Sequence, residues 1–452
     1  MKNTQNASPD TIDTLIHARW IIPVAPADQV LEHHAIAVHE GCILEILPSH
    51  EADEKYTADA VHQLSGHALI PGLVNAHTHA AMSLFRGLAD DLPLMDWLQN
   101  HIWPAEGKWV NAEFVADGTR LAIAEMLRGG TTCFNDMYFF PDETARVADN
   151  AGIRAVVGLI VIDFPTVWAT NADEYLSKGI EVHDSYRNNP LITTAFAPHA
   201  PYTVSDEPLQ RILTFADEMD VPIHMHLHET EHEVQEAESN TDLRPLARME
   251  ALGLISPRFM AVHMTQLVDE EIDQIATRGA HIVHCPESNM KLASGYCPVQ
   301  KLLNAGVNVA LGTDGAASNN DLDMFGEMRS AALLGKVVAR DASALNATQV
   351  LHMATLGGAK ALGLEAQIGS LEIGKAADIT AVNLGALETQ PVYHPISQLV
   401  YAAGREHVSD VWVAGQHLLK DRMLTTLDQQ AILNKAKQWG EKILVADEQP
   451  GE

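Results

Sequence analysis

The middle of the chain repeats one pattern, in which a short apolar run typical of a buried strand precedes a helix-like stretch. The strand-like runs are ALIPGLVNAH, TTCFNDMY, RAVVGLIVID, ITTAFAPHA, PIHMHLHE, FMAVHMT, HIVHCP and NVALGTDG. Strands that are apolar almost throughout are needed where both faces of a sheet are buried. Eight such units over about 250 residues predict an α/β fold, a (β/α)8 TIM-type barrel.

A doubly wound open sheet is the alternative arrangement for such units. Its dinucleotide-binding members carry GxGxxG directly after the first strand, and no such run follows the first strand here. The chain has 452 residues, which suits one very large domain or one large and one small domain. The barrel therefore remains the favoured arrangement, with part of the chain left over.

The two ends of the chain have a different pattern from the middle. Residues from about 12 to 70 contain short strands and turns, and so do the tail segments GSLEIGKAADITAVN and HVSDVWVAGQHLLKDRML. Each end alone offers few strands, so we expect them to pair in one small domain. The predicted domains are a barrel over 71–365 and a small β domain from 1–70 plus 366–452, with a terminal helix from about 427.

Charge and composition narrow the classes of partner. The net charge is −31, from 29 basic and 60 acidic residues, which argues against binding nucleic acid or anionic membranes. A small nucleoside in a local pocket is still compatible with this charge. No run of about 18 apolar residues predicts a membrane helix, and the first residues, MKNTQNASPD, lack the apolar core of a secretory signal.

The chain has few cysteines, and their spacing contains no closely spaced pair. The four cysteines, Cys42, Cys133, Cys285 and Cys297, form no CxxC pair. This usage favours reduced thiols and a cytoplasmic location over a disulfide scaffold.

Polar side chains follow the strand-like runs at the point where each run stops. In a barrel this is the rim on which active sites are built. His77 and His79 end the first run, and on a strand both would point to the same face. Two imidazoles there suit a shared metal ion, with Zn–N contacts of about 2.0–2.1 Å. Two unrelated core histidines are the alternative interpretation.

The fifth run carries three alternating histidines, His224, His226 and His228, which share one face while the strand stays regular. Not all three can be metal ligands. Glu229 follows them, and a carboxylate there can carry protons between water and substrate. An acidic residue at a helix N-terminus would look the same.

Two further groups end later runs. His263 ends the sixth run and could hold an attacking water or polarise the substrate, although a lone histidine is commonly a core residue. Asp314 ends the eighth run and could ligate a metal ion and accept a proton, although Asp-Gly also favours a turn. His281 and His284 are interpreted as structural. Because all the candidates fall on one rim, together they predict a metal-dependent hydrolase.

Five long stretches carry a family resemblance: PGLVNAHTHAAMSLFRGLADDLPLMDWL, PHAPYTVS, HMHLHETEHE, HCPESNMKLASG and GTDGAASNNDLDMFGEMR. With them the chain resembles the amidohydrolase superfamily over nearly its whole length. Within that superfamily it is most similar to the 5′-methylthioadenosine/S-adenosylhomocysteine deaminases. The segment GSLEIGKAADIT resembles the small β-sandwich domain that caps such barrels.

The resemblance implies roles for individual residues. It implies four metal ligands: His77, His79, His226 and Asp314. Glu229, three residues after His226, matches the proton shuttle of the family, and His263 matches the histidine that orients or polarises groups at the metal.

It also implies contacts to a nucleoside. His199 matches a substrate-contacting histidine, Glu106 a carboxylate that binds the ribose hydroxyls, and Trp97 an aromatic wall near the purine. Glu229 and Asp314 are expected to contact the substrate as well. Without the resemblance, Glu106 would read as a surface acid and Trp97 as a core indole.

The fourth run bears on the number of metal ions. Binuclear members of the superfamily bridge two ions with a carboxylated lysine there, whereas here the run ends in APHAPYT without a lysine. One divalent ion is expected, and zinc suits the ligands, as iron(II) or manganese(II) also would. No PCxxC pair of the other zinc deaminase type is present.

The resemblance implies hydrolytic deamination at C6 of the adenine ring of 5′-methylthioadenosine, S-adenosylhomocysteine or adenosine, giving the inosine analogue and ammonia. Deamination or hydrolysis of another amino-heterocycle, such as guanine or an s-triazine, is the alternative, and so is a non-catalytic scaffold of the same fold. Retention of all four ligands and Glu229 argues against the scaffold. A homo-oligomer is left open.

A loop after the third run bears on the substrate. In some family members this loop supplies an arginine for the carboxylate of S-adenosylhomocysteine, but DFPTVWATNADEYLSK has none. Arg154 and Arg187 flank it. The apolar Phe164, Val167 and Trp168 would instead favour the methylthio group, so we expect 5′-methylthioadenosine to be the better substrate.

Overall fold

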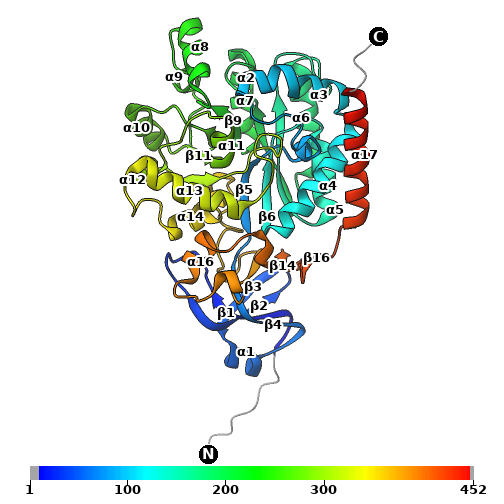
Figure 1. Cartoon of the computed structure of the whole chain (residues 1–452), viewed down its shortest axis with the longest axis vertical. Helices are drawn as coiled ribbons and strands as arrows, with labels where there is room; N and C mark the ends of the chain where they lie inside the picture. The colour runs from blue at the N-terminus through cyan, green and yellow to red at the C-terminus, as the bar shows by residue number, and fades with distance from the viewer. Residues whose placement is uncertain (1–9, 448–452) are drawn as a thin grey trace, which may run out of the picture.

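The computed structural model describes residues 10–447, and its core is a parallel barrel (Figure 1). Eight strands pair in sequence order from β5 to β12. Their bounds are β5 Leu73–Thr78, β6 Thr131–Asp136, β7 Arg154–Val161, β8 Ile192–Pro198, β9 Ile223–Leu227, β10 Phe259–His263, β11 His281–His284 and β12 Val309–Leu311. The predicted barrel is confirmed, and each of the eight apolar runs supplies one of these strands.

Helices surround the barrel because each βα crossover returns the chain along its outside. Those between the barrel strands are α2 Leu94–Asp96, α3 Trp103–Trp109, α4 Ala112–Arg128, α5 Pro141–Ala151, α6 Ala172–Tyr186, α7 Asp206–Met219, α8 Glu231–Thr241, α9 Pro245–Ala251, α10 Asp269–Arg278, α11 Pro286–Lys291 and α12 Val299–Asn304. After β12 come α13 Met324–Ala339, α14 Ala347–Met353 and α15 Leu356–Ala361. A 3₁₀ turn, η1 Ala80–Phe85, follows β5, and one π-helical segment, η2 Trp97–Ile102, joins α2 to α3.

The barrel closes where β12 meets β5. The backbone N–H of Asp314 donates to the carbonyl of His77 over 3.0 Å. The Asn75 side chain accepts from Thr313 N–H at 3.0 Å and donates to the Thr313 hydroxyl at 2.8 Å. A Cβ at Gly312 would lie only 2.8 Å from the His77 nitrogen, so glycine permits this approach. Closure therefore brings the ends of the first and last barrel strands together.

A second eight-stranded sheet is built from both ends of the chain, as predicted, and lies below the barrel in Figure 1. Its order is β16-β15-β14-β13-β4-β1-β2-β3. The strands are β1 Asp10–Ile21, β2 Leu31–His39, β3 Cys42–Pro48, β4 Tyr56–Pro71, β13 Ile379–Asn383, β14 Val408–Val413, β15 Gln416–Lys420 and β16 Met423–Leu424. Two short helices accompany it, α1 Ser49–Lys55 and α16 Pro395–Tyr401, with 3₁₀ turns η3 Leu387–Thr389 and η4 Arg405–His407.

The two sheets share a continuous stretch of chain. Residues 68–71, which the sequence suggested as the start of the first barrel strand, pair with β13 in the second sheet. Only Gly72 separates β4 from β5. The apolar run ALIPGLVNAH is thus divided between two sheets, because residues buried in either sheet look alike in sequence.

The predicted terminal helix is α17, Gln429–Asp447, and it runs beside α4 on the outside of the barrel (Figure 1). The Trp439 indole N–H donates to Asp117 over 3.1 Å, and its ring lies edge-on to Phe114 at 5.2 Å. The predicted domain boundaries stay a prediction. We propose that α17 be grouped with the barrel, because its apolar face packs there.

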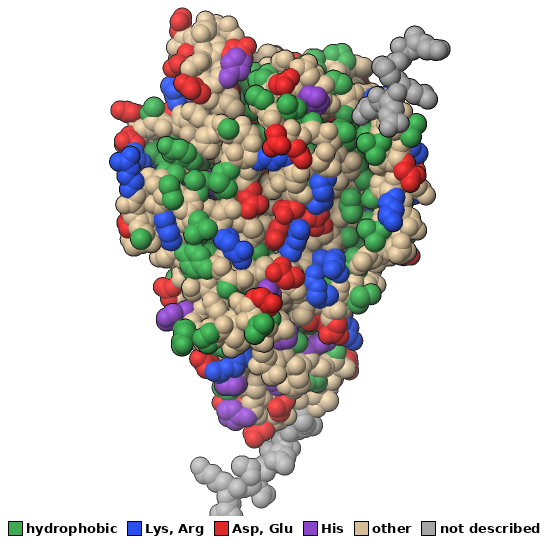
Figure 2. All heavy atoms as spheres, in the orientation of Figure 1, with side chains coloured by type: hydrophobic (Ala, Val, Ile, Leu, Met, Phe, Trp, Pro, Cys, Tyr) green, Lys and Arg blue, Asp and Glu red, His purple; other side chains and the backbone are tan. Residues whose placement is uncertain are grey.

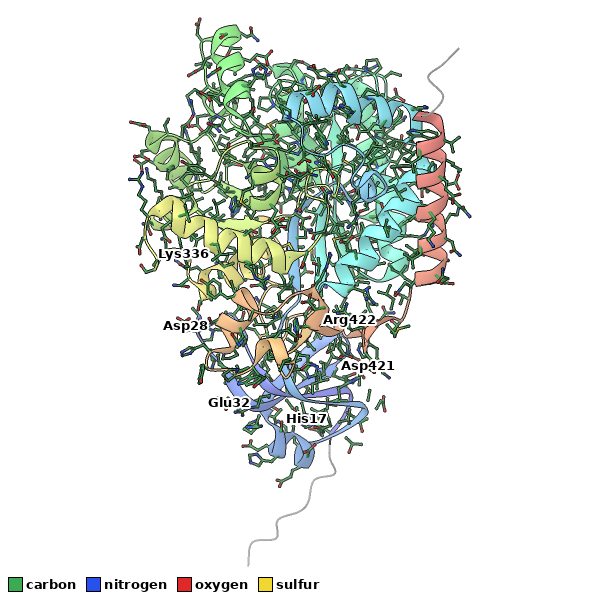
Figure 3. The ribbon with its side chains drawn as sticks, viewed as in Figure 1. His17, Asp28, Glu32, Lys336, Asp421 and Arg422 are labelled. Atoms are coloured by element: carbon green, nitrogen blue, oxygen red, sulfur yellow. The ribbon has the colours of Figure 1, made fainter. Side chains whose placement is uncertain are left out.

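Polar contacts join the barrel to the second sheet. Arg154, at the start of β7, forms two hydrogen bonds of 3.1 and 3.2 Å with Asp378, and both side chains are buried. Arg422, labelled in Figure 3, lies at the same junction and accepts from Arg128 of α4 through its carbonyl. These contacts lie at the opposite end of the barrel from the strand ends that carry the candidate site residues.

Charged side chains of both signs lie on the surface of the described residues (Figure 2). On the face shown in Figure 2, acidic and basic side chains are interspersed among the described residues. Within residues 10–447, no helix combines the length and apolar content needed to cross a membrane. The polar first residues examined for a secretory signal lie mostly outside the described part of the chain.

Replacing Arg154 by methionine should destabilise the protein, because it leaves the buried Asp378 carboxylate without its counter-charge. Breaking a buried ion pair by removing one partner costs about 3–5 kcal/mol. Urea unfolding followed by circular dichroism measures this loss. The exposed pair of Lys301 with Asp269 provides the control, and Lys301→Met should change the unfolding free energy by less than about 0.5 kcal/mol. Equal effects of the two variants would contradict the structural role given to Arg154.

Candidate active site

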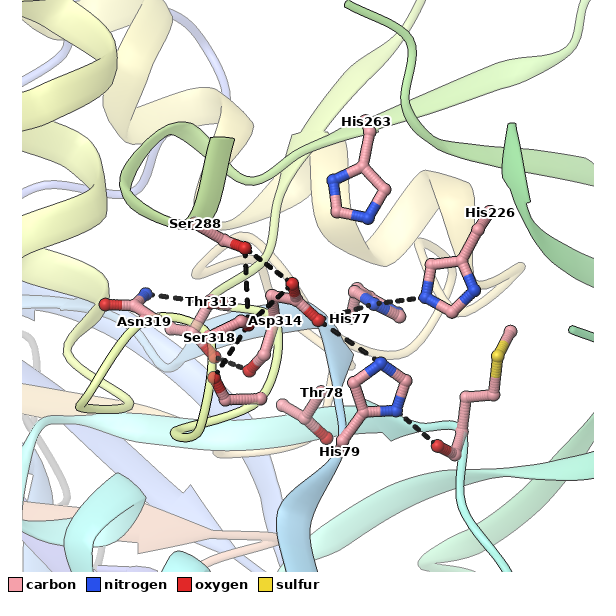
Figure 4. A network of polar contacts seen from close by, with 12 residues as sticks. His77, Thr78, His79, His226, His263, Ser288, Thr313, Asp314, Ser318 and Asn319 are labelled. Atoms are coloured by element: carbon pink, nitrogen blue, oxygen red, sulfur yellow. Dashed lines mark hydrogen bonds and ion pairs between the residues drawn. The ribbon is translucent and has the colours of Figure 1, made fainter. Parts of the chain in front are cut away.

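Four side chains meet above the carboxyl ends of the barrel strands, drawn in Figure 4. His77 lies near the end of β5 and His79 just beyond it, while His226 lies on β9 and Asp314 follows β12. One donor atom from each lies within 4.8 Å of all the others. The structure therefore brings together all four side chains that the family resemblance suggested as ligands.

The spacing of these atoms can be compared with what a metal ion needs. Tetrahedral bonds of about 2.0–2.1 Å place ligand atoms roughly 3.3–3.4 Å apart. Asp314 Oδ1 lies 3.2 Å from Nε2 of both His77 and His79, and the Nε2 atoms of His77 and His226 are also 3.2 Å apart. Three imidazoles and one carboxylate at this spacing fit a single divalent ion.

Outer hydrogen bonds orient two of the imidazoles. His79 Nδ1 lies 2.5 Å from the carbonyl of Met137, and His226 Nδ1 lies 2.8 Å from the carbonyl of His199. Since a carbonyl can only accept, Nδ1 carries a hydrogen in both rings, which leaves Nε2 as the atom that would bind a metal ion at the centre. Such outer-shell bonds set ring orientation and raise ligand basicity at metal sites.

The three alternating histidines around β9 lie in three different surroundings. The strand ends at Leu227, so His226 reaches the cluster while His224 lies behind it, with its Nε2 2.9 Å from His77 Nδ1. His228 has left-handed backbone, φ +51°, and its ring accepts the backbone N–H of Leu246. The regular alternation expected from the sequence thus stops one residue short of His228.

Asp314 is held from both sides. Its Oδ1 faces the histidines, and its Oδ2 accepts from the hydroxyls of Ser288 at 2.6 Å and Ser318 at 2.8 Å (Figure 4). Burial disfavours its charge, but the hydrogen bonds with His77 and His79 outweigh this and hold the pKa of Asp314 well below its usual range. Asp314 therefore remains a carboxylate.

Glu229 lies beside this cluster and has the opposite environment. Its side chain is buried, and burial raises the pKa of its carboxyl, as does the charge of Asp314. Its backbone N–H donates to Glu233 over 2.7 Å, which fixes the start of the loop. Its Oε2 lies 3.9 Å from His263 Nε2. A carboxyl group with a raised pKa can serve as a proton donor near neutral pH.

A cavity with a volume of about 260 Å³ opens above the cluster. This is slightly below the roughly 300–1,000 Å³ typical of small-molecule sites. All the suggested substrate-contact residues, Trp97, Glu106, His199, Glu229 and Asp314, line it. Burial raises the pKa of Glu106 to about 7 and lowers that of His199 to about 3. Without the family resemblance, Glu106 would be interpreted as a surface acid, but in the structure it forms part of the cavity wall.

The loop after β7 forms part of the same wall. Phe164 and Val167 line the cavity, whereas Trp168 packs against Phe140 with ring centroids 5.1 Å apart. Of the apolar side chains expected at the substrate, Trp168 is therefore the one that lies elsewhere. Its sequence neighbours face the cavity instead.

Sequence reasoning missed the groups that hold the site in place. Ser288 and Asn289 begin α11 after β11, and Ser318 follows β12. Asn289 Oδ1 lies 2.8 Å from Nδ1 of His263. The stretch HCPESN suggested family membership but no contacts, because the partners lie on other strands. His281 and His284, interpreted as structural, do not line the cavity.

Comparison with known proteins agrees with this fold and site. The amidohydrolase family model matches residues 68–418. Proteins named 5-methylthioadenosine/S-adenosylhomocysteine deaminase from Teredinibacter turnerae and Saccharophagus degradans are each 51% identical. The alignments cover 96% and 95% of this chain, and 98% and 97% of those proteins.

Solved structures extend the comparison. A zinc-bound adenosine deaminase from Xanthomonas campestris superposes with a TM-score of 0.95 at 54% identity, covering 97% of this chain and all of that chain. The guanine deaminase of E. coli shares the fold, with a TM-score of 0.82 at 22% identity over 90% of this chain and 99% of its own. The family model covers the barrel together with β13 and β14 of the second sheet, so the chain belongs to the amidohydrolase family.

Proposed function

We propose that this protein hydrolytically deaminates C6 of the adenine ring of 5′-methylthioadenosine and related nucleosides, including S-adenosylhomocysteine. The observation that carries the proposal is the His₃Asp cluster with Glu229 beside it at the base of the cavity. The substrate class is supported by relatives that are 51% identical and bear that name. The products are the inosine analogue and ammonia.

The chemistry at the cluster calls for a divalent ion, which we propose to be zinc. When bound by His77, His79, His226 and Asp314, such an ion lowers the pKa of water towards about 7. The remaining work falls to side chains of this chain, which hold water and substrate and move protons between them.

In the addition step, Asp314 takes a proton from the water molecule that attacks C6. His263 Nε2 accepts a hydrogen bond from that water and keeps it in line with the ring. Glu229 gives its proton to N1, which removes the negative charge that develops there as oxygen bonds to C6. The raised pKa of Glu229 and the lowered pKa of Asp314 support a proton-donating Glu229 and an ionised Asp314 at the start of the reaction.

In the collapse step, the new hydroxyl on C6 returns a proton to Glu229 as the C6 carbonyl forms. Asp314 gives its proton to the departing amine, which leaves as ammonia. N1 keeps the proton that it received, so water supplies the oxygen and both side chains recover their starting forms. The reaction therefore consumes one water and needs no further reactant.

The cavity wall supports a nucleoside over a free base. We propose that Glu106 binds the ribose hydroxyls, Trp97 flanks the purine and His199 contacts the substrate. A free-base deaminase or a triazine hydrolase would have no use for Glu106. Structures with those activities are 22–23% identical to this chain and share its fold. A cytoplasmic location and a homo-oligomer stay predictions.

Replacing Glu229 by glutamine should lower kcat at least about 100-fold, because the amide cannot give a proton to N1 or take one from the C6 hydroxyl. Bound metal, measured by elemental analysis, should stay near one ion per chain. Glu236→Gln, on the exposed side of α8, is the matched control and should keep activity within about twofold. Near-normal turnover in Glu229→Gln would refute the shuttle role.

Removing the metal by dialysis against a chelator should abolish activity, because the uncatalysed pKa of water is far above neutral. Added zinc, iron(II) or manganese(II) should restore it. The His226→Ala variant should bind less than one-tenth of the normal metal content. Full activity in chelated protein shown to be metal-free would exclude the proposed chemistry.

The substrate ranking follows from charge in the cavity. Among the described residues, its lining includes no arginine or lysine. Arg154 is bound to Asp378 at the far end of the barrel, and the exposed Arg187 lies 3.9 Å from Asp184. The carboxylate of S-adenosylhomocysteine would therefore find no cationic partner of the kind that carboxylates favour.

We therefore expect kcat/KM for 5′-methylthioadenosine to exceed that for S-adenosylhomocysteine by about tenfold or more, as measured by ammonia release. Val167→Arg places a guanidinium on the cavity wall and should reduce this ratio, whereas Val167→Leu should preserve it. Preference of the unaltered protein for S-adenosylhomocysteine would contradict this ranking without affecting the proposed reaction.

A further inference from the structure

Two side chains in the first turn of α11 form hydrogen bonds with residues that the proposed reaction uses. Ser288 donates its hydroxyl hydrogen to Asp314 Oδ2 over 2.6 Å, as Figure 4 shows. The next residue, Asn289, places its Oδ1 2.8 Å from His263 Nδ1. Both side chains are fully buried, at 0% and 1% exposure. One helical turn thus contacts His263, the last residue of β10, and Asp314, which follows β12.

The contact between Asn289 and His263 has a defined direction. An amide oxygen can only accept, so the hydrogen lies on His263 Nδ1. In the neutral ring Nε2 then carries a lone pair, and this atom is the one that lies 3.9 Å from Glu229 Oε2. The Asn289 Nδ2 atom has no hydrogen-bond partner among the described residues. The side chain therefore makes a single specific contact, with His263.

The backbone conformation and ring stacking of His263 show which features of this residue the Asn289 contact adds to. His263 ends β10 with φ +74°, a left-handed conformation that costs energy for a residue other than glycine. Its ring stacks on His226 with centroids 5.4 Å apart and planes 17° apart. Stacking sets the plane of the ring but does not decide which nitrogen carries the hydrogen. The Asn289 oxygen does decide it.

We propose that Asn289 is a positioning residue that fixes His263 as the Nδ1–H tautomer, so that Nε2 accepts a hydrogen bond from the attacking water. This inference rests on the proposed deamination. Where a histidine handles a proton in catalysis, holding it in the wrong tautomer can lower kcat by up to about 10⁴. Ser288 orients Asp314 in a similar way, but Ser318 shares that task, so Asn289 is the side chain without a substitute.

The decisive variant is Asn289→Leu, which keeps side-chain volume and removes the acceptor. It should lower kcat about 30-fold or more while KM changes less than about threefold and metal content stays at one per chain. Asn289→Asp keeps an oxygen in place and should recover kcat to within about tenfold of the unaltered protein. Ser294→Ala serves as the control, with unchanged kcat, because it removes a buried hydroxyl near the same turn that has no hydrogen-bond partner among the described residues.

A double-mutant cycle separates positioning from general damage to the fold. In a His263→Phe background the ring can still stack but offers no nitrogen to orient, so Asn289→Leu should lower the residual kcat by less than about threefold. Coupling of this size is expected for groups that act as one unit. If Asn289→Leu costs the same factor in both backgrounds, the positioning role is overturned.

The tautomer can also be read without any turnover. Nitrogen-15 shifts of labelled histidine in the zinc-loaded protein, with His263 assigned by its Phe variant, should show protonated Nδ1 and bare Nε2. Asn289→Leu should yield a mixture of the two tautomers. A protonated Nε2 in the unaltered protein would overturn this inference even if the protein deaminates nucleosides. The expected tautomer in a protein that deaminates no adenine nucleoside would count against the proposed function alone.

Discussion

Closure of the barrel between β5 and β12 is the constraint on which the candidate site depends. The proposed ligands His77 and Asp314 are 237 residues apart in sequence. They become neighbours because the Asp314 N–H donates to the His77 carbonyl and the Asn75 side chain bridges to Thr313. Loss of these contacts between β5 and β12 would separate two of the four donor atoms. The same contacts thus complete the fold and the metal-binding geometry.

The surroundings of two buried carboxyl groups, Asp314 and Glu229, shift their pKa values in opposite directions. Asp314 receives hydrogen bonds from two histidines and two serines, which favour its charged form. Around Glu229, burial outweighs the effect of the nearby His263 and raises the pKa of the carboxyl, which favours its protonated form. Groups of the same type with pKa values pushed apart are the usual basis for acid and base assignment. The proposed metal ligands would account for hydrolysis, and the proposed acid would account for a ring nitrogen as the protonated target.

Much of the fold could be predicted because its signals are local. Eight apolar runs marked the barrel strands, and alternating segments at both ends marked the second sheet. The division of residues 68–73 between two sheets could not be predicted, since both halves are equally apolar. His228 lies outside β9 because its backbone is left-handed, and the alternation of residue types in the sequence does not indicate such a turn. The contacts of Ser288 and Asn289 depend on which loops meet above the barrel, which no local pattern specifies.

The central claim is that one metal ion and Glu229 act together on C6 of an adenine nucleoside. A crystal structure of the zinc-loaded protein with a purine ribonucleoside that hydrates at C6 would test it most directly, using anomalous scattering to count and locate the ions. We expect one ion bound by His77, His79, His226 and Asp314, with the Glu229 carboxyl about 2.6–3.2 Å from N1. Two ions in the site, or a ring whose N1 is turned away from Glu229, would contradict it.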